Sequence, residues 1–117
     1  MSEIFISFNE RSWFNMTIRD WLKKPVRMHT YGIQENRPRL YCNDGYSISV
    51  QASSFHYCRP RLDGIQNYQS VELGFPSMED ELINEYAEDE PYTETVYGYV
   101  PIEIVEELIN KHGGIKA

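Results

Sequence analysis

The chain has 117 residues, of which 41% are apolar and 25% are charged, an ordinary composition for a globular domain with one hydrophobic core. No stretch approaches the ~20 consecutive apolar residues that a membrane-spanning helix needs, and the two cysteines are too few for a disulfide framework. The first residues lack the basic region and apolar segment of a signal peptide, so we expect a cytoplasmic protein.

The net charge of −7 is unevenly distributed along the chain. Residues 1–61 hold nine Lys or Arg against five Asp or Glu, whereas residues 62–117 hold two against thirteen. The stretch from Glu79 to Glu94 carries eight carboxylates and no basic residue. Such a surface repels nucleic acid and attracts a basic groove on another protein. Two alternatives stay open: the run is simply solvated, or the basic half folds against it.

Two elements are predicted in the first quarter of the chain. The largely apolar run Ile4–Phe8, which a turn-like stretch follows, indicates a strand. Thr17 followed by Asp20 is typical of a helix N-cap, and the helix should end before Pro25, which cannot continue the helical hydrogen bonds.

The middle of the sequence predicts a β-hairpin. A strand over residues 40–42 leads into Asn43-Asp44-Gly45, whose residues tolerate the positive φ of a tight turn. Residues 46–53 then alternate apolar and polar side chains, so one face of the returning strand should be buried and the other solvated.

Residues 71–75 alternate in the same way and predict another strand. Ser77 fits the start of a helix that should run to about Tyr86, followed by an acidic loop over residues 87–94. Residues 95–100 predict a further strand.

That strand should place Tyr97 and Tyr99 on one face. Pro101 suits the first turn of a last helix, and Gly113-Gly114 suits its exit. The mixture of a hairpin with short helices predicts a single α+β domain over residues 1–117. We expect an antiparallel sheet of about four to five strands with two to three short helices on one face.

Cys42, His56 and Cys58 form one candidate metal site, which His29 would complete. Zinc prefers thiolate and imidazole ligands, although this spacing matches no common structural zinc site. The simpler interpretation is two buried thiols and a surface histidine. Because the sequence also lacks a phosphate loop, a serine nucleophile motif and a dinucleotide fingerprint, we expect a protein that is not an enzyme and needs no cofactor.

Four arginines bracket the predicted hairpin: Arg37, Arg39, Arg59 and Arg61. With Tyr41 and Tyr57 nearby, they could hold single-stranded nucleic acid. The acidic net charge argues against this, so we expect these arginines to pair with the acidic half of the chain instead.

Three stretches of the chain, residues 42–53, 97–101 and 106–114, resemble small proteins carried by bacteriophages and mobile elements. In size, acidity and lack of catalytic motifs the chain is similar to anti-CRISPR proteins. That resemblance implies an inhibitor whose carboxylates stand in for phosphates in the nucleic-acid channel of a CRISPR effector.

The leading hypothesis is therefore an inhibitor of a host nucleic-acid-handling protein that does not itself bind nucleic acid or a membrane. The candidate contact residues are Glu79, Asp80, Glu81, Glu85, Tyr86, Glu88, Asp89, Glu90, Tyr92 and Glu94. Two alternatives are a zinc-stabilised domain and a homodimer in which the basic half of one copy meets the acidic half of the next.

Overall fold

The computed structural model describes residues 16–23, 37–65 and 67–117, and the predicted strand Ile4–Phe8 lies outside these ranges. The described part contains a four-stranded antiparallel sheet in which each strand pairs with the next one along the chain. The strands are β1 (Leu40–Tyr41), β2 (Ser47–Gln51), β3 (Ser70–Gly74) and β4 (Val96–Pro101).

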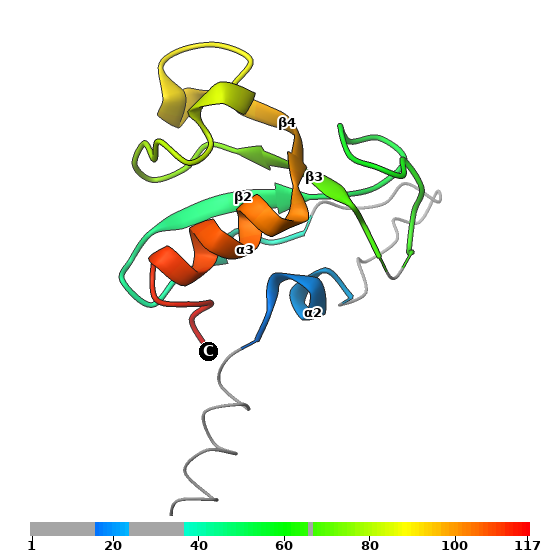
Figure 1. Cartoon of the computed structure of the whole chain (residues 1–117), viewed down its shortest axis with the longest axis horizontal. Helices are drawn as coiled ribbons and strands as arrows, with labels where there is room; N and C mark the ends of the chain where they lie inside the picture. Colours follow the sequence, from blue (N-terminus) through cyan, green and yellow to red (C-terminus); the bar gives the residue numbers. More distant parts are fainter. Residues whose placement is uncertain (1–15, 24–36, 66) are drawn as a thin grey trace, which may run out of the picture.

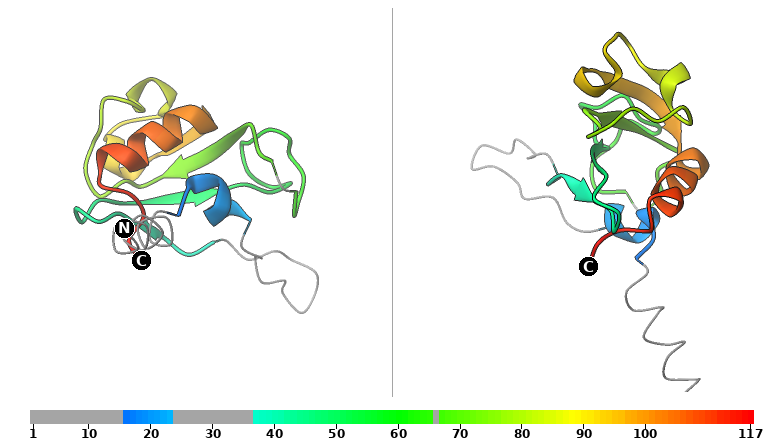
Figure 2. Two further views of the ribbon diagram at one scale, coloured as in Figure 1. Left: turned by 60° about the horizontal axis from the view of Figure 1, so that its bottom comes forward. Right: turned by 90° about the vertical axis from the view of Figure 1, so that its left-hand side faces the viewer.

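Two helices, α2 (Ile18–Leu22) and α3 (Ile102–Lys111), pack against each other on one side of this sheet (Figures 1 and 2). Thr17 caps α2 by accepting the Asp20 N–H, as the sequence predicts. None of the helices in the described part of the chain is long and apolar enough to cross a membrane. The α+β class with an antiparallel sheet is confirmed.

The predicted hairpin is present as β1 and β2, with Leu40 opposite Ile48. Gly45 adopts a φ of +98° in the turn, and Asp44 accepts the Tyr46 N–H at 2.9 Å. A residue with a side chain would be strained at this φ, whereas glycine adopts it freely, so glycine at position 45 favours the turn.

The expectation that one face of the β2 segment is solvated is wrong. Ser47 and Gln51 are buried together with their apolar neighbours. The Ser47 hydroxyl accepts from Arg39 Nε at 2.9 Å, and the Gln51 amide exchanges two hydrogen bonds with the backbone of Arg37. Polar side chains on the second face are therefore covered by neighbouring segments that satisfy their hydrogen bonds.

The predicted helix from Ser77 to about Tyr86 does not form. Only the short 3-10 turn η1 (Asn84–Tyr86) is helical there. The Ser77 hydroxyl accepts the Ser47 N–H at 2.9 Å, so it serves the sheet and not a helix N-terminus. Asp80 turns into the interior, where its side chain accepts the Leu82 N–H in a local turn. These tertiary contacts override the helical pattern.

Tyr97 and Tyr99 do not share a face, contrary to the prediction. Tyr97 is fully buried, whereas Tyr99 is 39% exposed and has a φ of +53°. Opposite them, Val71 pairs with Val100 but Leu73 pairs with Tyr97, so β4 holds one extra residue. This β-bulge turns the Tyr99 ring outward.

The final helix α3 matches its prediction at both ends. It begins directly after Pro101 and buries Val105, Leu108 and Ile109 against the sheet. Gly113 and Gly114 follow with φ values of +89° and +87°. Their N–H groups bond to the carbonyls of the last turn of α3, which ends the helix.

Candidate functional site

Residues 79–94, called the acidic segment here, form an excursion between β3 and β4 (Figure 1). The segment includes the 3-10 turns η1 and η2 (Tyr92–Glu94). Its backbone is joined to β4 at two points: Ala87 forms a β-bridge with Tyr97, and the Glu88 N–H bonds to the Val96 carbonyl at 3.0 Å. The Tyr97 hydroxyl also donates to the Tyr92 carbonyl. The acidic segment is thus braced against the sheet.

Seven of the eight predicted carboxylates of the acidic segment are exposed. They are Glu79, Glu81, Glu85, Glu88, Asp89, Glu90 and Glu94. Within the part of the chain that the structure describes, none of them forms a salt bridge with a lysine or arginine. Their negative charge therefore faces solvent without compensation from described cations. A basic partner that bound them would reduce the repulsion among these carboxylates.

Asp80, the eighth carboxylate, is not a surface contact residue, because only 5% of it is exposed. It lies 2.9 Å from His112 Nε2 and 3.0 Å from Lys111 Nζ. The sequence interpretation placed Asp80 on the surface only because it lies within an acidic run.

Tyr86 and Tyr92, the two proposed aromatic anchors, are half-buried against the hydrophobic core. Each ring therefore contributes to the fold and leaves only part of its surface for a partner. Pro91, between them, is exposed next to Glu90. The tip of the acidic segment, residues 88–94, thus presents carboxylates around an exposed proline ring.

The buried end of α3 carries a group that the sequence analysis missed, the His112 cluster of Asp44, Tyr46, Asp80, Lys111 and His112. The two ring nitrogens of His112 lie 2.7 Å from Asp44 Oδ2 and 2.9 Å from Asp80 Oδ2. Each ring nitrogen of His112 therefore lies within hydrogen-bond distance of a carboxylate oxygen. The Tyr46 ring stacks on the His112 ring, with centroids 3.8 Å apart.

The carboxylates of the His112 cluster have lowered pKa values. Burial alone would raise the pKa of Asp80, but hydrogen bonds from the Leu82 N–H, His112 and Lys111 together lower it. The pKa of Asp44 is lowered mainly by the Tyr46 N–H and then by His112. Both ring nitrogens of His112 are occupied and the residue is buried, so the cluster fastens α3 to the hairpin turn.

The proposed metal ligands Cys42, His56 and Cys58 are not brought together. No group of three His, Cys, Asp or Glu side chains among the described residues could hold a metal ion. The backbone N–H of Cys42 donates to the Tyr46 carbonyl at the turn end of the hairpin, whereas Cys58 lies beyond the other end of β2. A five-residue strand of about 17 Å separates the two positions. His29, the fourth candidate, lies outside the described residues.

Both thiols are buried and free. Burial, followed by the charge of Asp44, raises the pKa of Cys42 to about 11. Burial also raises the pKa of Cys58, whose thiol donates to the Ser53 carbonyl at 3.2 Å. A raised thiol pKa reduces the thiolate that a nucleophile or a zinc ligand needs. The interpretation as buried thiols is the one that the geometry favours.

The expected pairing of the four arginines with the acidic half is not found among the described residues. Arg37 and Arg39 donate to backbone carbonyls and to Ser47. Arg59 and Arg61 are exposed and lie over tyrosine rings, as described below. Among the described residues, the salt bridges between Arg and Glu instead join Arg19 of α2 to Glu103 and Glu106 of α3.

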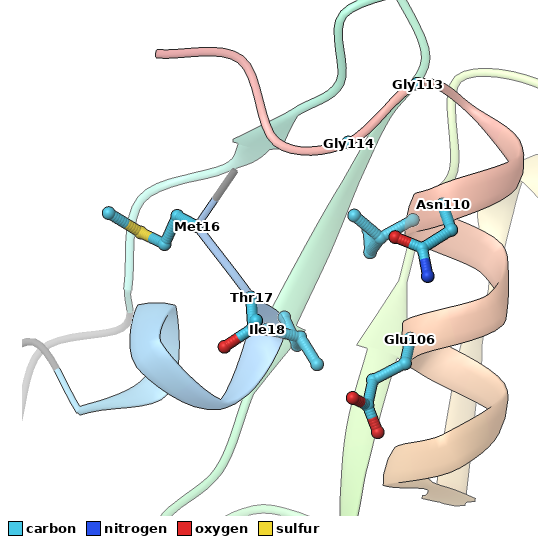
Figure 3. Close-up of a pocket in the computed structure, with 8 residues that line it drawn as sticks. Met16, Thr17, Ile18, Glu106, Asn110, Gly113 and Gly114 are labelled. Carbon is cyan, nitrogen blue, oxygen red and sulfur yellow. The ribbon is translucent and has the colours of Figure 1, made fainter. Parts of the chain in front are cut away.

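A cleft of about 390 Å³ lies between α2 and α3, and its lining residues are drawn in Figure 3. Its lining residues are Met16, Thr17, Ile18, Glu106, Ile109, Asn110, Gly113 and Gly114. Glu106 is the titratable side chain of this lining, and it already lies 3.6 Å from Arg19. The cleft therefore offers packing surface but no set of groups for acid–base or nucleophilic chemistry.

Searches of protein families, of curated proteins and of solved structures found no match to this chain.

Proposed function

We propose that this protein is a phage- or mobile-element-encoded inhibitor that binds the basic nucleic-acid-binding groove of a host protein through its acidic segment. A CRISPR effector is the host protein that the sequence resemblance suggests. The observation that carries the proposal is the set of seven exposed carboxylates without a described cation partner, on a backbone tied to β4.

Two physical arguments support this function. Uncompensated carboxylates attract a basic groove over about a Debye length, and neutralising them on contact removes their mutual repulsion. The bracing of the acidic segment by Ala87, Glu88 and Tyr97 reduces the conformational entropy that binding would otherwise cost. Carboxylates carried on this braced backbone can thus take the place of a run of phosphates.

The proposal requires no cofactor and assigns no catalytic residue. It also places the protein in the cytoplasm, where the host's nucleic-acid-handling proteins act. The two buried free thiols are compatible with a reducing compartment.

The test measures binding of target DNA by a panel of purified, guide-loaded CRISPR effectors in the presence of increasing amounts of the protein. We expect the wild type to displace DNA from at least one effector, with a potency that falls as salt rises. The variant E88Q/E90Q should lose roughly tenfold or more in potency, because it removes two charges from the exposed tip.

The matched control is E103Q/E107Q, which removes two exposed carboxylates from α3. This variant should inhibit like the wild type. Equal potency of E88Q/E90Q and the wild type would exclude the acidic segment as the contact. If the wild type displaced DNA from none of the effectors, CRISPR effectors would be excluded as its targets. A pull-down from a nuclease-treated lysate would then have to identify another basic host protein that binds it.

A further inference from the structure

A second surface, the Arg–Tyr patch, consists of Tyr57, Arg59, Arg61 and Tyr99, and the exposed Phe55 lies two positions before Tyr57 in the chain. The Arg59 guanidinium lies 5.1 Å from the centroid of the Tyr99 ring, and the Arg61 guanidinium lies 5.6 Å from that of Tyr57. The two rings are themselves 5.9 Å apart. The side chains thus form a row in which two tyrosines lie between two arginines.

The Arg–Tyr patch is exposed at every position. Tyr57 is 42% exposed and both arginines face solvent, and Phe55, nearby in the chain, is 71% exposed. Tyrosine and arginine are enriched in the residues that dominate protein interfaces, because they offer apolar area together with polar groups. Two exposed tyrosines beside two cations, with a further exposed aromatic residue close by in the chain, therefore indicate a binding surface.

The backbone holds this patch in place. The Tyr99 N–H bonds to the Tyr57 carbonyl at 3.0 Å, and Glu72 accepts the Tyr57 N–H at 3.0 Å. Gly98 lies directly against the Tyr57 side chain, since a Cβ at its position would be 3.4 Å from the Tyr57 Cβ. Tyr99 keeps its φ of +53° despite the strain of that conformation, and strained residues recur at binding sites.

The chemistry of the patch selects a short, acidic peptide segment. A guanidinium stacked on a ring keeps its in-plane N–H groups free for bidentate bonds to a carboxylate. The exposed ring faces suit an apolar group between such carboxylates. A nucleic-acid strand fits less well, because it needs a longer run of cations and would meet the net charge of −7.

A segment of this kind lies on the same molecule. The tip of the acidic segment places the exposed Pro91 between the exposed carboxylates of Glu90 and Glu94. The loop over residues 53–65 (green) and the tip (yellow) lie on opposite sides of the sheet region in Figure 1 and in the left view of Figure 2. The tip of one copy can therefore reach the patch of another, with complementary charge.

We propose that the Arg–Tyr patch binds the tip of the acidic segment, residues 88–94, of a second copy of this chain. The contact is head-to-tail, so it does not close on itself in a pair and extends into short chains as concentration rises. If the proposed function holds, self-association covers the acidic segment until a more basic partner displaces the second copy.

The experiment uses sedimentation velocity of the full chain over a hundredfold range of concentration at low and high salt. We expect the weight-average mass to rise above the monomer mass of 13.8 kDa at low salt and to return to it at high salt. R59Q/R61Q lacks the charges of the patch, and E88Q/E90Q lacks charges of the tip. Each should associate at least tenfold more weakly than the wild type.

Mixing these two variants is the decisive step, because one retains an intact tip and the other an intact patch. The mixture should form a 1:1 complex and nothing larger, since the remaining tip and patch are disabled. The control E103Q/E107Q should associate like the wild type, and circular dichroism should show that all variants are folded.

Three results would overturn the proposal: a monomeric wild type at every concentration, undiminished association of R59Q/R61Q, or no complex in the mixture. Fluorescence anisotropy with a labelled oligothymidine covers the other class of ligand. Binding that is lost in R59Q/R61Q, without self-association of the wild type, would assign the patch to nucleic acid. All these measurements use only this chain or the oligonucleotide, so their failure leaves the inhibitor proposal to its own DNA-displacement test.

Discussion

The Asp80 carboxylate accepts three hydrogen bonds inside the fold, from the Leu82 N–H, His112 and Lys111. A carboxylate is rarely buried unless such partners compensate its desolvation. Leu82 is two positions from Asp80 in the chain, whereas His112 and Lys111 are about 30 positions away. The sequence pattern around Asp80 therefore contains no signal for its burial. An acidic run predicts exposure for each of its members, and only the tertiary structure distinguishes the one that is buried.

We expect Asp80→Asn to lower the free energy of unfolding by about 2–3 kcal/mol at neutral pH, because it removes the charge that His112 and Lys111 face. The pKa of Asp80 is lower in the folded state than its ordinary value. Its contribution is therefore complete above about pH 4, the unfolded value, and is lost as pH falls through the lowered folded value.

Urea unfolding at a series of pH values from neutral to acidic measures this effect. The wild type should lose stability more steeply on the acid side than Asp80→Asn. Part of the slope should remain in the variant, because Asp44 also has a lowered pKa. Identical acid slopes in the two proteins would show that Asp80 is not a stabilising carboxylate.

Tyr99 offers a second test of a single residue, because its backbone conformation favours glycine. In Tyr99→Gly the relief of strain should offset the lost contacts with Tyr57 and Arg59, so the free energy of unfolding should stay within about 1 kcal/mol of the wild type. Tyr97→Ala, two residues away in the core, should cost about 3 kcal/mol or more. Chemical denaturation compares the two variants. A large loss in Tyr99→Gly would mean that Tyr99 serves the fold and not the Arg–Tyr patch.

At the scale of elements, the end of α3 depends on two consecutive glycines with positive φ. The Gly113 N–H donates to the Asn110 carbonyl. A Cβ at position 113 would lie 3.3 Å from the Cβ of Asn43. The helix exit and the hairpin turn therefore meet where only a glycine fits without strain.

We expect Gly113→Ala to lower the free energy of unfolding by more than about 1 kcal/mol, because alanine is strained at a φ of +89°. Gly74→Ala is the matched control. Its backbone does not have a positive φ, and the added Cβ would make an ordinary contact at 3.5 Å with Val96. Thermal unfolding of both variants measures the difference, and equal melting temperatures would contradict this account of the helix exit.

Local signals predicted those elements that local interactions define. The hairpin, the Thr17 cap and the glycine exit of α3 each depend on residues a few positions apart, and all three are confirmed. The helix from Ser77 is wrong because Ser77 and Asp80 bond to residues about 30 positions away. The outward turn of Tyr99 requires a bulge against β3, which no pattern within β4 encodes.

At the scale of the whole molecule, the sequence predicted the charge imbalance but not its arrangement. The acidic run indicated a surface, and seven of its eight carboxylates are exposed. The arginines were expected to neutralise that surface, whereas Arg59 and Arg61 form the Arg–Tyr patch with the rings of Tyr99 and Tyr57. The contribution of Tyr99 was missed because it depends on which segments the fold places side by side.

Among the described residues, the negative acidic segment and the positive Arg–Tyr patch lie apart, and this separation contributes an electric dipole that runs between them. In the field of a basic groove such a dipole experiences a torque, which turns the acidic end toward the groove before contact. The cationic end then points away from the groove, into solvent. Orientation would thus precede collision, and a bound molecule would still display a row of arginine and tyrosine on its outer side.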